Sequence, residues 1–369
     1  MIQWRRGVVV EVRSRWAGAV EYAVRLASAD VVRALGYVDV VGALEVGTEV
    51  LLNTTALERG LGTGGLAIVV AAPEALPDPV DDVSRVPGHV VKARYTPSQT
   101  MVLGVDEQDS AHHAVLAEAD DLAALPVVVA DLHSALPAIL AGIRETDPAL
   151  RVGYVMTDGG ALPIDFSRTV ARLREAGWLA ASITVGQAFG GDLEAVNVHT
   201  GLLAAHHVVG ADVVVVAQGP GNLGTGTRWG FSGTSAGEAV NAAATLGGRA
   251  VCSLRISQAD PRERHYGVSH HSLTAYGRVS LVPADVPVPL LEGELAEIGA
   301  RVLMQARELC TSSGGRLRLH EVSCEGLEPA LRTSPVPLRT MGRGYDDDRA
   351  GFLGAAVAGR YAAGLVRPA

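Results

Sequence analysis

Residues 219–224, Gly-Pro-Gly-Asn-Leu-Gly, follow the apolar run VVVVAQ and match the spacing G-x-G-x-x-G of dinucleotide-binding loops. In such loops the helix begins inside the motif, so that its first amides face the pyrophosphate. Here the motif is followed by TGTRWGFSGTSAGE, which is too rich in glycine and aromatic residues to begin a helix. The spacing therefore does not indicate a dinucleotide site. It is typical of a loop that binds an anion beside Arg228, covers a ligand, or packs tightly between domains.

Five apolar runs, each typical of a buried strand, are followed by clusters of polar residues and glycines. The carboxyl ends of parallel strands meet at one edge of a sheet, where ligands bind, so the clusters together predict a site at that edge. Any single cluster is more typical of an ordinary turn or helix cap. The clusters are Asp131-Leu-His133-Ser134, Thr157-Asp158-Gly159-Gly160, Gln187 with Gly190, Gly191 and Asp192, Gln218 with Gly219, Gly221 and Asn222, and Ser257-Gln258 with Asp260, Arg262, Arg264 and His265.

Histidine is the second chemical signal, because several of the 11 histidines are paired and the segment RHYGVSHHS holds three of them. Converging histidines and acids are what a metal hydrolase needs, but H-E-x-x-H and other dedicated spacings are absent. We therefore assign no metal ligands from the sequence. A G-K-[ST] phosphate loop is absent too, and Lys92 is the single lysine.

These patterns favour an enzyme that acts on a small anionic or phosphorylated metabolite, with no cofactor identified. A non-catalytic metabolite-binding or regulatory protein and a scaffold or assembly protein are the alternatives. The candidate acid–base groups are Asp131, His133, Asp158, His270 and His271. The candidate ligand-binding residues are Gln187, Gly190, Gly191, Gln218, Gly219, Gly221, Asn222, Gly224, Thr225, Arg228, Arg262 and His265, with Arg264 as a further anion-binding arginine.

Composition excludes several classes of partner. The chain has 369 residues, 48% of them hydrophobic, which is enough for two domains with cores of their own. The net charge is −9 and no large basic cluster is present, so we expect no nucleic-acid partner. No apolar run approaches the roughly 18 residues of a membrane helix. The three cysteines lie far apart, which is typical of free thiols in the cytoplasm, and a homo-oligomer is compatible with all of this.

The pattern of elements divides the chain into two domains. Residues 1–106 hold six or more short strands with glycine turns and no convincing helix, which predicts a small β-barrel of OB or SH3 type. Within them, HVVKARY and MVLGVDE predict a hairpin. Residues 107–369 repeat strand–helix units whose strands are apolar on both faces, which predicts an α/β domain with a mostly parallel, Rossmann-like sheet between two helical layers.

Periodicity predicts the individual elements of the α/β domain. The segment from about residue 286 is the least clear, because its pattern does not say whether it joins the main sheet. Helices are expected over 164–176, 192–208, 235–246, 290–309 and 346–365, a single strand over 249–257, and a further strand in RLRLHEV.

Segments along nearly the whole chain resemble an uncharacterised bacterial family, mostly actinobacterial, known as domain of unknown function 3866. The resemblance implies a cytoplasmic single-chain protein. It implies no activity, cofactor or catalytic residue, so no role is carried over from it. The matching segments are LLNTTALERGLGTGG, PGHVVKARYTP, DEQDSAHH, VVVADLHSALPAI, VMTDGGALPIDFSRTV, GQAFGGDLEAVNVHTGL, AQGPGNLGTGTRWGFSG, GVSHHSLTAYGRV and TMGRGYDDD.

Overall fold

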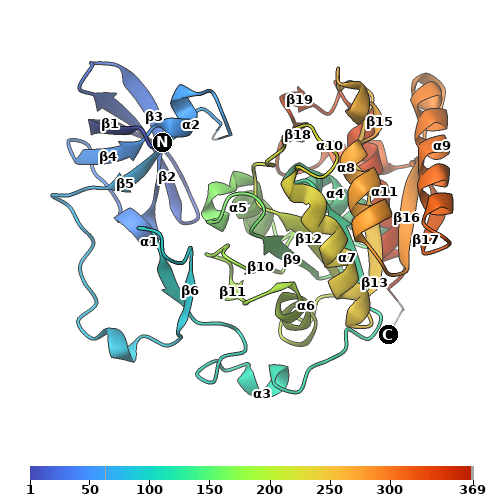
Figure 1. Ribbon diagram of the computed structural model, residues 1–369, viewed down its shortest axis with the longest axis horizontal. Coiled ribbons are helices and arrows are strands. Elements are labelled where there is room, and N and C mark those ends of the chain that lie inside the picture. Colours follow the sequence, from blue (N-terminus) through green and yellow to red (C-terminus); the bar gives the residue numbers. More distant parts are fainter. Residues whose placement is uncertain (63, 367–369) are drawn as a thin grey trace.

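The computed structural model contains an N-terminal barrel and a larger α/β domain, which stand side by side in Figure 1. It describes residues 1–62 and 64–366. Residues 63 and 367–369, which belong to the expected barrel and the expected C-terminal segment, lie outside the described residues. Among the described residues, every helix is too short or too polar to cross a bilayer.

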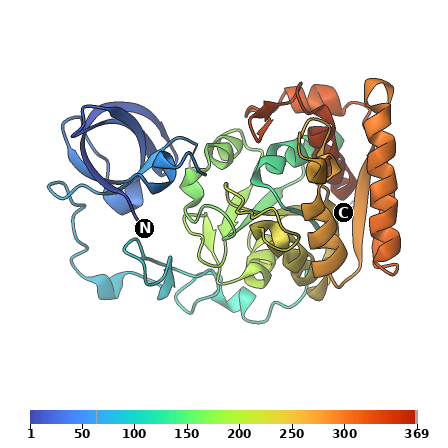
Figure 2. The same ribbon diagram turned by 45° about the horizontal axis from the view of Figure 1, so that its top comes forward.

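The barrel closes in the order β1-β2-β3-β5-β4, and Figure 2 shows it as a ring. Strands β3 and β5 pair in parallel and the other pairs are antiparallel. Valines and leucines that alternate along the strands fill its interior, among them Val9, Val24 and Leu52. This five-stranded arrangement is of OB type. The elements are β1 (Trp4–Trp16), β2 (Ala19–Leu26), β3 (Val31–Tyr37), β4 (Glu49–Asn53) and β5 (Ala67–Ala71), with single-turn helices α1 (Val38–Val41) and α2 (Thr55–Glu58).

The expected sixth strand lies outside the barrel. Strands β6 (Val90–Lys92) and β7 (Thr100–Val102) form the predicted antiparallel hairpin as a sheet of their own. The physical reason is Lys92, whose buried ammonium donates to the carbonyl oxygens of Ala188 (3.0 Å) and Ala195 (2.8 Å) and lies 3.4 Å from Glu194 Oε2. These acceptors belong to the α/β domain, so Lys92 holds the hairpin there.

The α/β domain contains an eight-stranded sheet in the order β11-β10-β9-β12-β8-β13-β16-β17. All its pairs are parallel, and the central strands are buried on both faces, as their apolar runs predict. The strands are β8 (Pro126–Ala130), β9 (Val152–Thr157), β10 (Ala181–Thr184), β11 (Leu193–Glu194), β12 (Val213–Gln218), β13 (Arg249–Ser253), β16 (Ala284–Leu290) and β17 (Leu317–Ser323).

Helices cover both faces of this sheet, which confirms the predicted three layers. One face carries α4 (Leu136–Thr146) and α11 (Arg349–Ala363), with α10 (Leu327–Arg332) against them; the other carries α6 (Val198–His207), α7 (Ser235–Thr245) and α9 (Ala296–Ser312). The short elements are α3 (His113–Leu116), α5 (Arg168–Glu175), α8 (His270–Thr274), β14 (Ile256–Ser257), β15 (Gly267–Val268), β18 (Arg339–Thr340) and β19 (Arg343–Gly344).

The helix expected over 192–208 begins later, at Val198. Asn197 is its N-cap and accepts a hydrogen bond from the Thr200 amide (3.0 Å). Asp192 instead accepts hydrogen bonds from the amide (2.7 Å) and hydroxyl (2.7 Å) of Ser182, which draws the chain into the edge strand β11. An acid near an apolar run resembles the start of a helix, but here its partner is a neighbouring strand.

Two expectations for the C-terminal half are wrong in detail. Strand β13 ends at Ser253, and residues 256–257 form β14 in a separate small sheet. The helix expected from residue 290 begins at Ala296, and β16 precedes it. Pro287 and Pro289 make this segment look unlike a strand in the sequence, because proline has no backbone N–H group. Strand β13 pairs with β16 only at Asp285, so β13 does not need the N–H groups that the two prolines lack. The segment from about residue 286 thus joins the main sheet.

Helices α4 and α11 approach closely through two glycines. A Cβ atom on Gly142 would lie 1.9 Å from the carbonyl oxygen of Ala356, and one on Gly359 would lie 2.0 Å from that of Ile139. Backbone atoms cannot move aside as a side chain can. The packing of this helical layer therefore depends on both glycines.

We predict that Gly142→Ala destabilises the protein by about 1–3 kcal/mol through overpacking, although alanine normally stabilises a helix interior by roughly 0.5–1 kcal/mol relative to glycine. The matched control is Gly364→Ala at the end of α11, where the new Cβ would lie 3.5 Å from the Tyr361 carbonyl oxygen, an ordinary contact. Urea unfolding of both variants measures the difference. Equal stability of the Gly142 variant and the wild type would contradict the close packing.

Candidate functional site

The candidate site lies at the carboxyl end of β8, which is flanked by β12 and β13. The helix that follows β8 covers one face of the sheet, whereas the helix that joins β12 to β13 covers the other. Connections that leave toward opposite faces open a crevice at the strand ends, where ligands bind in this class of fold. The predicted edge is therefore formed, with β8 at its centre.

Asp131 is the first residue after β8 and is 2% exposed. Its Oδ2 atom has no hydrogen-bond partner among the described residues and lies 3.6 Å from Nδ1 of His271. Its backbone oxygen accepts a hydrogen bond from Gln218 Nε2 (3.0 Å), which holds the turn in place. A buried polar atom without a partner costs free energy, which makes this carboxylate a candidate for a functional role.

His265, His270 and His271 gather beside Asp131, with ring centroids 4.4–5.0 Å apart. Ser269 caps α8 and its hydroxyl bonds Nδ1 of His265 (2.8 Å), which orients that ring. Burial, with nearby Arg255, lowers the pKa of His265 to about 3. Burial, with His271 and Arg264, lowers the pKa of His270 to about 4. Both imidazoles are therefore neutral at neutral pH.

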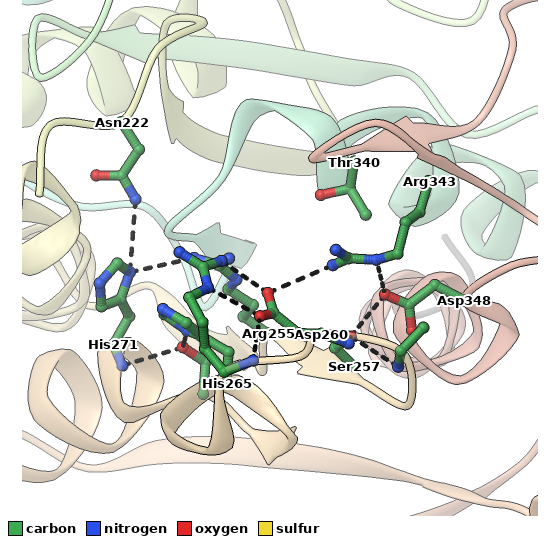
Figure 3. Close-up of polar contacts among 12 residues, drawn as sticks. Asn222, Arg255, Ser257, Asp260, His265, His271, Thr340, Arg343 and Asp348 are labelled. Carbon is green, nitrogen blue, oxygen red and sulfur yellow. Dashed lines mark hydrogen bonds and ion pairs between the residues drawn. The ribbon is translucent and has the colours of Figure 1, made fainter. Parts of the chain in front are cut away.

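Arg255 completes this wall of the site. Its guanidinium donates to Nδ1 of His271 (3.2 Å), as Figure 3 shows, and no carboxylate of the described residues forms an ion pair with it. Burial lowers the pKa of Arg255, partly offset by the charge of Asp131. Asn222, from the loop after β12, lies 3.5 Å from the same His271 nitrogen.

A network of arginines and acids holds the loop that carries Arg255 and the histidines (Figure 3). Arg262 binds both oxygens of Asp260 (2.8 and 2.7 Å) and holds the pKa of that carboxyl well below its usual range. Arg343 binds Asp348 (2.9 Å), which also accepts a hydrogen bond from Ser257 (2.6 Å). Arg262 is therefore engaged in structure and is not the free anion-binding group that its sequence position predicts.

A cavity of about 600 Å³ opens beside His270. Arg228, Arg264 and Arg278 line it, together with Gly226 and with Gln305 and Glu308 of α9. The three guanidiniums are exposed, and none forms an ion pair with an acid of the described residues. We call this cavity the arginine pocket; its lining favours an anionic ligand.

The glycine-rich loop after β12 does not have dinucleotide-binding geometry. The backbone amide of Thr225 donates to the carbonyl oxygen of Gly230 (2.7 Å), which folds the loop back on itself. The next helix, α7, begins only at Ser235. A Cβ on Gly219 would lie 2.5 Å from the Ala161 carbonyl oxygen, so this glycine allows a close approach of two loops. Gly221 adopts φ +95°, which favours glycine. Of this loop, Gly226 and Arg228 reach the arginine pocket, and Gly224 and Thr225 do not line it.

His133 is placed apart from the other candidates. Its Nε2 bonds the hydroxyl of Ser167 (2.7 Å) and its Nδ1 bonds that of Tyr154 (3.0 Å), so both ring nitrogens are occupied. The ring borders a separate cavity of about 500 Å³ between the barrel and the α/β domain. There Trp16 Nε1 donates to the Asp165 carbonyl oxygen (2.7 Å), which joins the two domains.

The polar clusters that follow β9 and β10 lie toward the β11 edge of the sheet. Asp158 accepts a hydrogen bond from the Gln187 amide (2.9 Å), and the Gln187 side chain accepts one from the Arg94 amide (3.0 Å). The Gly190 amide donates to Glu194 (2.6 Å) and the Gly191 amide to Thr184 Oγ1 (3.1 Å). These contacts hold β11 and the β6–β7 hairpin in place.

Two residues of the site, Arg255 and Arg278, have no signal in motif spacing. Arg255 stands inside RAVCSLRIS, and a charged residue in an otherwise apolar run is the feature that could have indicated it. Arg278 lies in a single turn of π-helix, Ala275–Val279, after α8, which no sequence pattern indicates.

The family model for the protein of unknown function DUF3866 matches residues 33–359. The chain belongs to the DUF3866 family. No curated protein and no solved structure matches it. The match begins inside β3 of the barrel and ends inside α11, so the DUF3866 region contains every residue of the candidate site.

We predict that His133 makes the stability of this DUF3866 protein depend on pH. Burial lowers the pKa of His133 to about 4, whereas an unfolded histidine titrates near pH 6.5. Between these values the unfolded chain binds a proton that the folded chain does not, so stability is present above about pH 6.5 and is lost as pH falls toward 4. The slope contributed is at most about 1.4 kcal/mol per pH unit.

His133→Asn should therefore reduce the slope of unfolding free energy against pH, between about pH 6.5 and 4.5, by up to about 1.4 kcal/mol per pH unit. Urea unfolding at a series of pH values measures this slope. Ser134→Ala is the control, because it alters the same turn without removing a titrating group. An unchanged slope in the His133 variant would show that this imidazole titrates normally in the folded protein.

Proposed function

We propose that this protein is an enzyme that acts on a small anionic metabolite, with a phosphorylated compound as the first candidate, at the carboxyl edge of its parallel sheet. The observation that carries the proposal is the arginine pocket beside His270, one residue away from the contact between His271 and the unpartnered carboxylate of Asp131. An anion-binding surface next to an unsatisfied acid is what substrate binding and proton transfer require.

Charge supports an anionic ligand. The chain carries a net charge of −9, yet the arginine pocket gathers Arg228, Arg264 and Arg278 without acids paired to them in the described residues. Guanidiniums bind phosphate and carboxylate through two parallel hydrogen bonds, so such a group of arginines favours ligands with these groups. Its volume of about 600 Å³ lies within the range of small-molecule sites.

Asp131 is the acid–base group of the proposal. Its Oδ2 is free to accept a proton from a bound substrate or a water molecule. Arg255 contacts Nδ1 of His271 (3.2 Å), the nitrogen that also faces Asp131, and would stabilise negative charge that develops on the reacting group. His265, His270 and His271 complete the wall of the site.

A non-catalytic metabolite-binding or regulatory protein is the second candidate. It is favoured by the fact that His133 and Asp158, two of the five acid–base candidates, are engaged in structural hydrogen bonds. The two functions differ in what Asp131 does. In a binding protein its replacement changes affinity only, whereas in an enzyme it abolishes turnover and leaves binding intact.

Anion binding tests the arginine pocket directly. Titration calorimetry with inorganic pyrophosphate should show binding to the wild type, and Arg228→Gln, Arg264→Gln and Arg278→Gln should each weaken it by about 10- to 100-fold, because each removes a charge-assisted hydrogen bond worth roughly 1.5–3 kcal/mol. Arg307→Gln is the matched control, since Arg307 lies on α9, which borders the pocket, but pairs with Glu321 (2.9 Å) outside it. Equal effects of all four changes would refute a specific anion site.

Turnover tests Asp131. Native mass spectrometry of the gently purified protein identifies a co-purifying anion, which is then used as substrate. Asp131→Asn should lower turnover by about 100- to 10,000-fold while anion affinity stays close to that of the wild type. Asp158→Asn, an exposed acid at the same sheet edge, should change turnover little. Anion binding without turnover in the wild type would favour the binding protein.

A further inference from the structure

The three clustered histidines offer a ligand set that the proposed function does not use. One nitrogen from each of His265, His270 and His271 can be chosen so that all lie within 4.8 Å of one another. All three come from one short segment, which begins in a single helical turn and ends in the first residues of α8. We propose that these imidazoles bind a divalent transition metal ion of the zinc class.

Hydrogen bonding leaves two of the ligand nitrogens free. Ser269 occupies Nδ1 of His265 (2.8 Å), so its Nε2 is available for a metal. Nε2 of His270 is buried and has no hydrogen-bond partner among the described residues. A ligand histidine normally has its other nitrogen held by a neighbouring group, as Ser269 holds that of His265.

The ligand set indicates the metal and its use. Imidazoles suit zinc, copper, iron and nickel, whereas magnesium and calcium prefer oxygen ligands. Three protein ligands leave a fourth position open for water or substrate, as in catalytic rather than structural zinc sites. The carboxylate of Asp131, 3.6 Å from His271, is placed to receive a proton from a group bound at that position.

Arg255 imposes a condition on this site. Its guanidinium donates to Nδ1 of His271 (3.2 Å), and Arg264 adds positive charge near His270. A metal ion must displace that hydrogen bond and overcome the repulsion of both arginines, unless an anion lies between them. We therefore expect metal and anion to strengthen each other's binding. This coupling rests on the proposed function, whereas the metal site does not.

The test uses the full chain after treatment with a chelator. Zinc titration by calorimetry should show one site, and cobalt(II) should give the intense visible bands of a four- or five-coordinate ion. Loss of a group that only holds a ligand histidine typically weakens metal binding by about 10- to 100-fold. His265→Ala and His270→Ala each remove a ligand itself, so each should weaken zinc binding by more than that. His199→Ala, an exposed histidine of α6, is the control. His270→Cys should restore binding and add a thiolate-to-cobalt charge-transfer band, which shows ligation independently of folding.

Unaltered zinc affinity in the His265 and His270 variants, or a cobalt spectrum of the hydrated ion in the wild type, overturns the metal site. Titration is repeated with sulfate, a tetrahedral dianion that leaves zinc in solution. A tighter zinc affinity with sulfate, by about 5- to 150-fold, supports the coupling. An equal affinity overturns the coupling alone, and pyrophosphate binding without any zinc separates the anion pocket from the metal site.

Discussion

The carboxylate of Asp131, buried at the end of the central strand β8, is the constraint on which the rest of the site depends. A carboxylate removed from water must be compensated by nearby positive charge or by hydrogen bonds. Here the nearby positive charge is that of Arg255, which lies more than a hundred residues further along the chain. The fold must therefore bring the loop after β13 back over the end of β8 and hold it there.

That loop has little regular structure of its own, so ion pairs hold it in place. The pair of Arg262 with Asp260 fixes its middle, and Arg343, which contacts both Asp260 (3.5 Å) and Asp348 (2.9 Å), joins it to the start of α11. Asp260 and Asp348 are fully buried, and burying an acid is stable only when its partners are retained. The C-terminal segment thus does more than extend the sheet, because it supplies the arginine and the acid that position the histidine wall.

The sequence predicts much of the fold and part of the site. Strand–helix alternation depends on local apolar runs, so the parallel sheet and the grouping of Asp131 with His265, His270 and His271 follow from it. Strand order is not a local property, and it places the clusters after β9 and β10, with Asp158 and Gln187, away from β13. Arg262 and Arg264 look alike in sequence, but Arg262 pairs with its near neighbour Asp260, whereas Arg264 lines a cavity that residues distant in the sequence complete.

In this site the arginines carry the positive charge, and His265 and His270 are uncharged at neutral pH. Burial and the neighbouring arginines keep His265 and His270 uncharged, so the positive charge of this region comes from guanidiniums, which stay protonated at any physiological pH. Anion attraction therefore does not depend on the imidazoles, whose lone pairs remain free for a proton or a metal ion. Under the proposed function Asp131 acts on the anion that the arginines bind, and nearby Arg255 offsets its negative charge. The acid is buried at the strand end while the arginines line the open cavity, as the proposed function requires: binding needs access from solvent, and electrostatic interactions with a reacting group are stronger where water is excluded.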